Sequence, residues 1–484
     1  MNVRNELFID GRWHAAAPGP GIAVMSPATE EQIGRVPDAS VQEVDLAVTA
    51  ARHAFDAGPW PHLSTAERAQ VLERALANLE PKLGEIANLV TAQMGLPTTI
   101  SRQKAPAGLW VGRYFLDLAR EQQTLDLRET RFGPAAVLRE PVGVVAAIAP
   151  WNSPFNMSIA KVVPALATGC TVVYKPAPET PLDSYLLAEA LEAAGLPAGV
   201  FNLVTGGRET GRALTAHPGV DKISFTGSTA AGREIARAAG PRFARLQLEL
   251  GGKSAAIIAS DADPAKVIRG IADGTFSNTG QTCSAFSRVL VPSGERDQWV
   301  EVLAAAARSF TIGDPFDPAT TLGPLASAAQ HKRVNGYLAL GQSEGARIAV
   351  GGGTPAGLER GHYLEPTVLV DADNSMRVSR EEIFGPVAVV IGYDGLEEAI
   401  AIANDTRYGL HGGVFTEDPA TAAHVARSVR AGSFTINRFA HNVQVPFGGV
   451  KDSGVGRELG AEGLQAFQEL KTVNLTEETA GVFG

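Results

Sequence analysis

The segment Val142–Ala149 reads V-G-V-V-A-A-I-A and runs directly into the loop sequence P-W-N-S-P at 150–154. An uninterrupted apolar run of this length, closed by prolines, predicts a strand that is buried on both faces. A helical segment is expected over 159–167, and a second apolar strand follows at Thr171–Tyr174, closed by the Pro-rich loop 175–178. A strand, a helix and a strand in this order predict a parallel β-α-β unit.

The same alternation continues beyond this unit. A helix is expected at 182–194, a strand at Phe201–Val204, and another strand at Lys222–Phe225 that leads into the turn T-G-S-T-A-A-G at 226–232. Buried strands that alternate with helices predict an α/β fold with a doubly wound, Rossmann-like sheet. Ligands of such sheets bind outside the carboxyl ends of the strands, so the loops after these strands form the expected binding edge.

A second α/β region is expected after residue 251. Its strands are predicted at Ser254–Ile258, Arg288–Val291, Val387–Ile391 and Gly413–Phe415. The main boundary of the chain therefore falls near residue 251.

Residues 121–141 fit neither half. The polar, alternating run Thr124–Val137 contains a Gly133-Pro134 break, which predicts a β-hairpin that projects from the body. The unpaired backbone edges of such a hairpin are best covered by another subunit, so a homodimer or homotetramer is expected. Residues 476–484 are expected to form a loose tail.

Composition and charge exclude several classes of function. The 484 residues are 45% hydrophobic and 19% charged, with a formal net charge of −10 and no polybasic block. Neither nucleic acid nor a membrane surface is therefore expected as the main partner. The two cysteines cannot make a secreted disulfide framework or a Cys-rich zinc site, and the nine histidines show no metal-ligand spacing. No apolar run approaches the length of a membrane span, and a cytoplasmic protein is expected.

Cys283 is the candidate nucleophile. It lies in N-T-G-Q-T-C-S (278–284), whose polar composition is not that of a core. A polar, loop-borne thiol is the better nucleophile, because only the thiolate attacks and apolar burial suppresses it. The alternative for a free cysteine is a small buried hydrophobe, and that structural role is expected for Cys170, which precedes the strand at 171–174.

Two further polar residues each have a structural and a catalytic interpretation. Glu249, in L-Q-L-E-L-G-G-K (246–253), lies on the strand face opposite the leucines. It is either a solvated carboxylate or, because the two glycines suggest close backbone approach at the strand end, a partly desolvated general base with a raised pKa. Asn152 is either a turn residue between two prolines or an amide donor.

Two glycine-containing segments differ in their suitability for binding phosphate. The stretch Gly227–Gly232 follows a predicted strand and opens a helix, which is the context of a pyrophosphate site. The run G-V-G-R-E-L-G at 454–460 has the wrong spacing and no clear preceding strand, so it is not expected to bind phosphate. The sequence contains no P-loop, no G-x-S-x-G elbow and no H-E-x-x-H motif, and no metal site is expected.

Together these stretches resemble the aldehyde dehydrogenase superfamily, of the NAD(P)-dependent, non-phosphorylating kind. The resemblance extends from about residue 7 to about residue 475. It is carried by motifs in the order of the family: P-W-N at 150–152, K-P at 175–176, F-T-G-S-T at 225–229, E-L-G-G-K at 249–253, G-Q-T-C at 280–283, E-I-F-G-P-V at 382–387 and P-F-G-G-V-K-x-S-G-x-G-R-E at 446–458.

The resemblance implies oxidation of an aldehyde to its carboxylic acid. The Cys283 thiolate would attack the carbonyl carbon, with the oxyanion held by the Asn152 amide and the Cys283 N–H. Hydride transfer would leave a thioester, which water activated by Glu249 would hydrolyse. The expected cofactor is NAD, with NADP tolerated, because Pro178 stands where NAD-preferring relatives often carry a glutamate, and Glu179 comes next. By the same resemblance the cofactor contacts are Trp151, Lys175, Gly227, Ser228, Glu382 and Phe384.

The expected aldehyde tunnel is mostly apolar and aromatic, which favours a small-molecule substrate that is a hydrophobic aliphatic or aromatic aldehyde of unspecified length. A semialdehyde is an alternative that would need a cation for its carboxylate, and Arg113 and Arg438 are nearby in the sequence. Further alternatives are a CoA-acylating dehydrogenase, which generally lacks the glutamate base, a cysteine hydrolase, and an inactive structural or binding member of the fold. The residues expected to line the tunnel are Trp110 or Tyr114, Met157, Phe286, His441 and Phe447.

The resemblance also divides the chain into three parts. These are a Rossmann-like cofactor-binding domain, a second α/β catalytic domain and a small projecting β oligomerisation element. Their expected residues are 1–118 with 141–250 and 452–465, then 251–451, and finally 119–140 with 466–484.

Overall fold

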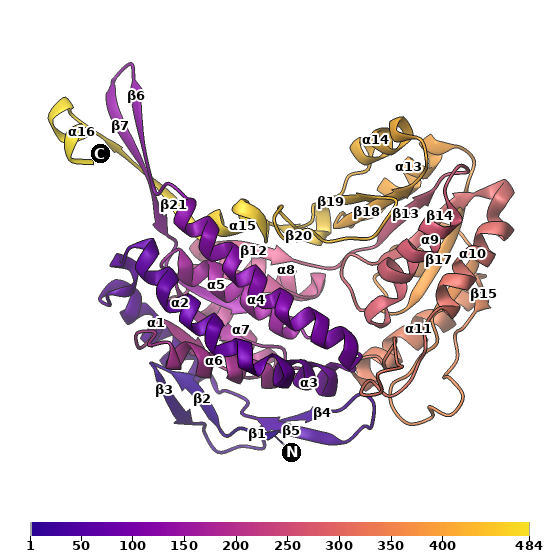
Figure 1. Cartoon of the computed structure of the whole chain (residues 1–484), viewed down its shortest axis with the longest axis horizontal. Helices are drawn as coiled ribbons and strands as arrows, with labels where there is room; N and C mark the ends of the chain where they lie inside the picture. Colours follow the sequence, from indigo (N-terminus) through magenta and orange to yellow (C-terminus); the bar gives the residue numbers. More distant parts are fainter. Residues whose placement is uncertain (1, 484) are drawn as a thin grey trace.

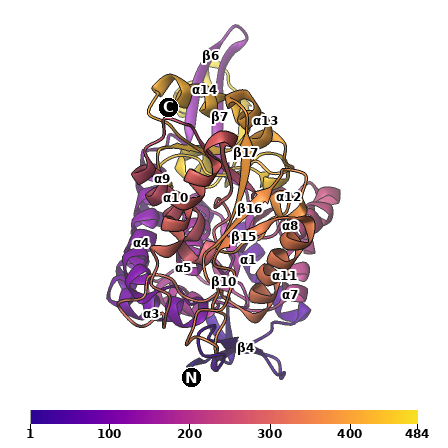
Figure 2. The same cartoon turned by 90° about the vertical axis from the view of Figure 1, so that its right-hand side faces the viewer.

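The computed structural model describes residues 2–483. Figure 1 shows two α/β bodies side by side, one formed by the indigo to magenta first half of the chain and one formed by the orange second half. A two-stranded ribbon projects from the first body beside the C-terminus, and the side view in Figure 2 shows the same ribbon rising above the rest of the molecule. The site lies where the two bodies meet.

The first sheet has the strand order β20-β12-β11-β8-β9-β10-β2-β3. The strands from β12 to β10 run parallel, and β20, β2 and β3 join antiparallel at the edges. The chain runs from β8 to β9 and β10 on one side and then to β11 and β12 on the other, so the switch point of this doubly wound sheet lies between β8 and β11. The bounds are β2 (Glu6–Ile9), β3 (Arg12–Ala15), β8 (Val144–Ile148), β9 (Thr171–Lys175), β10 (Phe201–Leu203), β11 (Lys222–Thr226), β12 (Arg245–Glu249) and β20 (Gly454–Val455).

Helices cover both faces of the first sheet. In β8, Val145 and Ala147 belong to the core under helices α2 to α6, whereas Val144 and Ala146 belong to the core under α1, α7 and α8. The two-sided burial predicted from the apolar run at 142–149 is confirmed. The helices are α1 (Val41–Asp56), α2 (Thr65–Leu79), α3 (Leu83–Met94), α4 (Thr98–Glu121), α5 (Pro154–Ala167), α6 (Leu182–Ala193), α7 (Arg208–Ala216) and α8 (Thr229–Ala239).

The second sheet has the order β15-β16-β17-β14-β13-β18-β19, parallel except for β15. Helices α9 and α10 cover one face, and α11 to α14 cover the other. The strands are β13 (Ser254–Ile258), β14 (Phe286–Pro292), β15 (Arg347–Val350), β16 (Thr367–Ala372), β17 (Val387–Tyr393), β18 (His411–Phe415) and β19 (Ser433–Ile436). The helices are α9 (Pro264–Ile271), α10 (Arg296–Arg308), α11 (Ala328–Glu344), α12 (Arg377–Arg380), α13 (Leu396–Asn404) and α14 (Pro419–Ser428).

The projecting element is the predicted hairpin, β6 (Leu125–Thr130) and β7 (Gly133–Pro141), with β21 (Gln468–Asn474) added antiparallel to β7. The expectation of a loose tail is wrong, because α16 (Glu477–Phe483) is a short helix that contacts β7. Remaining elements are β1 (Asn2–Val3), β4 (Ile22–Met25), β5 (Gln32–Val36), α15 (Gly460–Gln465) and the short turns η1 (Trp60–His62), η2 (Glu80–Lys82), η3 (Gly240–Arg242), η6 (Ser293–Glu295) and η7 (Lys451–Ser453).

The two sheets contribute opposite strand ends to the site. The loops after β8, β11 and β12 leave the carboxyl ends of the first sheet, as expected for a ligand site. In the second sheet, Cys283 and Glu382 precede β14 and β17 and therefore lie at the amino ends of its strands. Within residues 2–483, no helix combines the length and the low polarity that a membrane span requires.

Candidate active site

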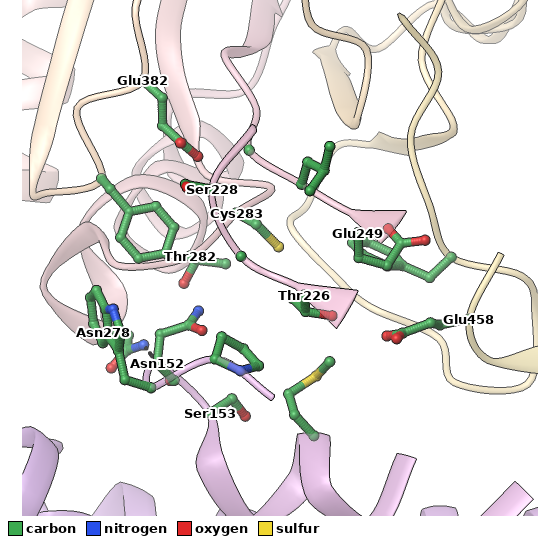
Figure 3. A pocket seen from close by; sticks show the side chains of 18 of the residues that line it. Asn152, Ser153, Thr226, Ser228, Glu249, Asn278, Thr282, Cys283, Glu382 and Glu458 are labelled. Atoms are coloured by element: carbon green, nitrogen blue, oxygen red, sulfur yellow. Dashed lines mark hydrogen bonds between the residues drawn. The ribbon is translucent and has the colours of Figure 1, made fainter. Parts of the chain in front are cut away.

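A cavity of about 410 Å³ lies between the two bodies and is lined from both. In Figure 3 the sulfur of Cys283 lies near the middle of this cavity, with Asn152 on one side and Glu249 on the other. The structure therefore brings the three expected catalytic residues together. The lining also includes the expected cofactor residues Trp151, Gly227, Ser228, Glu382 and Phe384.

The loop before Cys283 has an unusual backbone. After the π-turn η4 (Ala272–Phe276), the turn η5 (Ser277–Gly280) places Asn278 and Thr279 at φ 57° and 55°. This left-handed conformation is costly for a β-branched residue, and such strain persists only where neighbours hold it. The Thr279 hydroxyl donates to the Gly323 carbonyl at 2.9 Å, and a Cβ on Gly280 would lie 2.1 Å from the Gly385 carbonyl oxygen. The loop is thus fixed against the segment that carries Glu382.

Cys283 as a residue is partly exposed, whereas Cys170 is buried in the first core, as expected for a structural cysteine. Burial and the nearby carboxylates Glu249 and Glu382 raise the pKa of Cys283 to about 12. A thiol with this pKa is protonated at neutral pH and must lose its proton before it can attack.

Asn152 follows β8, and its side-chain amide donates to the Gln281 carbonyl oxygen at 2.9 Å. Asn278 donates to the same carbonyl at 3.2 Å. A side-chain amide has two N–H groups, so one donor of Asn152 remains for a ligand in the cavity that this residue lines. The geometry fits an amide donor rather than a simple turn residue.

Glu249 is the last residue of β12 and is only 3% exposed, so it is not a solvated carboxylate. Neither carboxylate oxygen has a hydrogen-bond partner among residues 2–483. Burial, and then the charge of Glu458, raise the pKa of Glu249 well above its ordinary value, while Lys161 and Arg457 lower it. A Cβ on Gly448 would lie 2.5 Å from one Glu249 oxygen, so glycine is needed there to make room for this carboxylate.

The two glycines after Glu249 allow the close approach that the sequence predicts. The Gly252 N–H donates to the Glu382 carboxylate at 3.1 Å, and a Cβ on Gly251 would lie 2.3 Å from that carboxylate. Beside it, the Phe384 ring meets the edge of Trp151 with centroids 5.3 Å apart. These groups line the same cavity as Thr226 and Gly227 at the end of β11.

The turn after β11 has the features of an anion site. Ser228 is the N-cap of α8, and its side chain accepts a hydrogen bond from the Ala231 N–H at 3.2 Å. The Thr226 hydroxyl lines the cavity, and its oxygen is buried without a partner among the described residues. Backbone N–H groups at a helix start, together with an unpartnered hydroxyl, suit the phosphates and amide of a dinucleotide.

Lys175 lies outside this cavity, at the end of β9 on the same sheet edge. Burial lowers its pKa to about 8, opposed by the charges of Glu179 and Asp38. Its ammonium donates to the Pro176 carbonyl at 3.0 Å, and a Cβ on Gly211 would lie 3.5 Å from its side chain. The position suits the outer, adenosine end of a dinucleotide.

The expected substrate residues divide into two groups. Met157, His441 and Phe447 line the cavity. The expectation for Phe286 is wrong: it is the first residue of β14, fully buried, and stacks on His411 in the second core. The expectation for Trp110 is also wrong, because this side chain is 47% exposed and does not line the cavity.

Tyr114, the alternative to Trp110, stacks on its ring with centroids 5.8 Å apart, and it too lies outside the cavity lining. Both corrections have the same cause: sequence spacing does not tell which face of a helix or strand points into a cavity.

One buried ion pair at the site was not predicted. Lys161, in the middle of α5, is fully buried and forms an ion pair with Glu458, which lines the cavity next to Glu249. Lys161 also donates to the Ser224 hydroxyl at 3.2 Å. The sequence contained a signal for this pair, because a lysine inside the apolar run of α5 is expected to be buried and to require an oppositely charged partner. Its partner lies 297 residues away, in the glycine run at 454–460.

Comparison with known proteins agrees with this geometry. The sequence model described as the aldehyde dehydrogenase family matches residues 13–473. The chain belongs to the aldehyde dehydrogenase family. Its expected enzyme class, an oxidoreductase acting on aldehydes, is therefore confirmed.

Members of the family with known structure or function resemble the chain over nearly its full length. A geranial dehydrogenase of Castellaniella defragrans is 44% identical over 97% of this chain and 98% of its own. A 3-succinoylsemialdehyde-pyridine dehydrogenase of a Pseudomonas species is 43% identical over 98% and 99%. The crystal structure of an aldehyde dehydrogenase of Mycobacterium tuberculosis complexed with NAD+ has a TM-score of 0.96 at 44% identity, covering 98% of this chain and 99% of that one. The resemblance and the fold class predicted from the sequence are confirmed.

Proposed function

We propose that this aldehyde dehydrogenase converts an aldehyde, NAD+ and water into a carboxylate, NADH and two protons through a thioester on Cys283. The observation that carries the proposal is the convergence of Cys283, Asn152 and Glu249 on one cavity. An aldehyde cannot release hydride to yield an acid until a nucleophile has added to its carbonyl carbon. The thiol, the amide donor and the base are the groups that this sequence of steps requires.

Each residue has one task in the reaction. The Cys283 thiol first loses its proton to solvent, and the sulfur then forms a bond to the carbonyl carbon. The free N–H of Asn152 and the Cys283 N–H hold the oxyanion. The C–H bond then breaks, with its electron pair leaving as hydride, and the carbon becomes a thioester. Glu249 finally removes a proton from water, which attacks the thioester and breaks the C–S bond.

Bound NAD supplies the hydride acceptor. The N-terminus of α8, the unpartnered Thr226 hydroxyl, Glu382 and the Trp151–Phe384 pair would hold it, and Lys175 would hold its adenosine ribose. The NAD+ in the related crystal structure supports this choice of cofactor. Glu179, one position after Pro178, acts electrostatically on Lys175. Its carboxylate would therefore lie near the adenosine ribose and repel the 2′-phosphate of NADP, which gives the preference for NAD.

We further propose that the substrate is an aldehyde with an apolar body. Met157, Phe447 and Leu459 line the cavity and support this preference. The relatives named for geranial and for a semialdehyde show that the family accommodates both kinds of substrate. A CoA-acylating reaction is disfavoured because Glu249 is in place to activate water.

Assembly and location are part of the proposal. The strands β6 and β21 leave free edges in the projecting sheet, and Leu127, Phe132 and Leu470 are exposed on it, which supports a homodimer or homotetramer. Light scattering that shows a monomer would refute this.

Two free cysteines favour a reducing compartment, the cytoplasm. The domain division near residue 251 is supported by the change of sheet between β12 and β13.

The test is NADH formation with a panel of aliphatic and aromatic aldehydes. The wild-type chain is expected to reduce NAD+ with at least one of them, and Cys283→Ala is expected to lose the activity while keeping its circular dichroism spectrum. If no aldehyde supports NADH formation, or if the Cys283→Ala variant retains most of the activity, the proposal is wrong.

A further inference from the structure

Lys104 is a cation in the active-site cavity that the reaction described above does not use. It lies on α4, and the amide of Asn156 on α5 donates to its backbone carbonyl at 3.3 Å, which ties this turn of α4 to the start of α5. The start of α5 also carries Met157, and both Lys104 and Met157 line the cavity. Lys104 therefore belongs to the substrate side, together with the apolar lining.

The ammonium group of Lys104 has no partner in the described part of the chain. No carboxylate of residues 2–483 lies within 4.0 Å of it, and the hydrogen bond from Asn156 reaches the backbone carbonyl of Lys104 rather than its ammonium group. The other cation of the lining, Arg333, donates to the carbonyl oxygens of Glu382 and Ile383 on the cofactor side. Lys104 is thus available to an anion that enters the cavity.

His441 links Lys104 to the nucleophile. Its ring Nε2 lies 3.0 Å from the hydroxyl of Ser284, the residue after Cys283. Burial, and then the positive charge of Lys104, lower the pKa of His441 to about 4, so this ring is neutral at neutral pH and adds no second positive charge. His441 therefore lies within electrostatic range of Lys104 and in contact with the residue after the nucleophile.

The two arginines considered from the sequence do not supply such a group. Arg113 is exposed and pairs with Glu80 on the outer face of α4, and Arg438 is exposed and does not line the cavity. Lys104 was not singled out because the sequence alone does not fix which face of α4 turns toward the nucleophile. The cavity is lined by the face that carries Lys104.

We propose that Lys104 binds an anionic group at the far end of the substrate, so that the preferred aldehyde is an ω-oxo carboxylate with an apolar chain between its two ends. This inference rests on the proposed function and adds a substrate class to it. The aldehyde carbon reaches Cys283 while the carboxylate pairs with Lys104. Protein around Lys104 removes part of its hydration and lowers its pKa, and a bound carboxylate reverses this effect by stabilising the charged form.

The experiment compares hexanal with 6-oxohexanoate, two aldehydes of equal chain length that differ in the terminal carboxylate. Values of kcat and KM are measured with NAD+ at low ionic strength for the wild type, Lys104→Met and Lys104→Arg. Both Lys104 and Arg102 are exposed, but only Lys104 lines the cavity. The matched control is therefore Arg102→Met, which removes a cation two residues away on the same helix.

Lys104→Met is expected to lower kcat/KM for 6-oxohexanoate by roughly 10- to 100-fold, the range of a charge-assisted hydrogen bond, and to change the value for hexanal by less than about threefold. The loss should appear in KM, Lys104→Arg should restore most of it, and Arg102→Met should have little effect. The inference would be overturned if Lys104→Met left the ratio of kcat/KM for 6-oxohexanoate to that for hexanal at its wild-type value. An equal loss of kcat/KM with both aldehydes would overturn it as well. Failure of every aldehyde to yield NADH would instead refute the proposed function.

Discussion

Replacement of Asn152 by alanine tests the oxyanion site, and the structure sets the size of the expected effect. Of the two N–H groups on this amide, one is used by the Gln281 carbonyl at 2.9 Å and one faces the cavity. The substitution therefore removes one oxyanion donor, which typically lowers the rate by about 10²–10³, or about 2.7–4 kcal/mol. The Gln281 carbonyl keeps the Asn278 donor at 3.2 Å, so no buried carbonyl is left unpaired and stability should change by only about 1 kcal/mol.

The assay is the rate constant of the first turnover, measured as NADH absorbance after rapid mixing with a saturating neutral aldehyde. Asn152→Asp keeps the shape but replaces the donor with an acceptor, so it should slow this phase more than Asn152→Ala. Asn156→Ala removes an amide four residues further along, outside the oxyanion site, and should change the rate by less than about threefold. A folded Asn152→Ala variant that loses less than tenfold, or an Asn152→Asp variant faster than Asn152→Ala, would refute the assigned role.

Three further predictions follow from neighbouring contacts. Glu249 acts as a base when deprotonated, so the deacylation rate rises as the pH passes its folded pKa. Glu458→Gln removes a negative charge that raises this pKa and should move the rise to lower pH. Lys161→Met removes a positive charge that lowers this pKa and should move the rise to higher pH. Shifts in the same direction would contradict this. Glu179→Gln should raise the ratio of kcat/KM for NADP to that for NAD roughly tenfold, about 1.4 kcal/mol, and an unchanged ratio would exclude Glu179 from cofactor selection. Gly448→Ala places a Cβ 2.5 Å from a Glu249 oxygen and should slow steady-state turnover while the first turnover is kept; equal loss in both phases would argue against a displaced base.

Much of the fold could be predicted because apolar runs and the turn residues that close them are local features of the sequence. The apolar run at 142–149 predicted a strand buried on both faces, and the strand expected at Ser254–Ile258 agrees with β13 residue for residue. The pairing of β20 with β12 and of β21 with β7 joins segments far apart in the sequence. No local pattern specifies such pairings, and they were not predicted.

The site shows the same division between local and distant information. Cys283, Glu249 and Asn152 were found because each lies in a short sequence pattern. These patterns are the polar loop around Cys283, the two glycines after Glu249 and the P-W-N motif that contains Asn152. Phe286 was misplaced because it is already the first residue of a central strand, where its side chain turns into the core. Side chains whose role depends on helix rotation or on a distant partner, such as Lys104 and Lys161, required the three-dimensional structure.

The central claim is a covalent acyl group on one sulfur, and trapping that group tests it most directly. Glu249→Gln removes the base that hydrolyses the thioester, at a residue with no hydrogen-bond partner among residues 2–483. The variant, mixed with aldehyde and NAD+, quenched in acid and digested, should carry the acyl group of the substrate on the peptide that contains Cys283. It should form about one NADH per chain, and the peptide of buried Cys170 should remain unmodified. One NADH per chain without acylated Cys283, or an acyl group on another residue, would contradict the account.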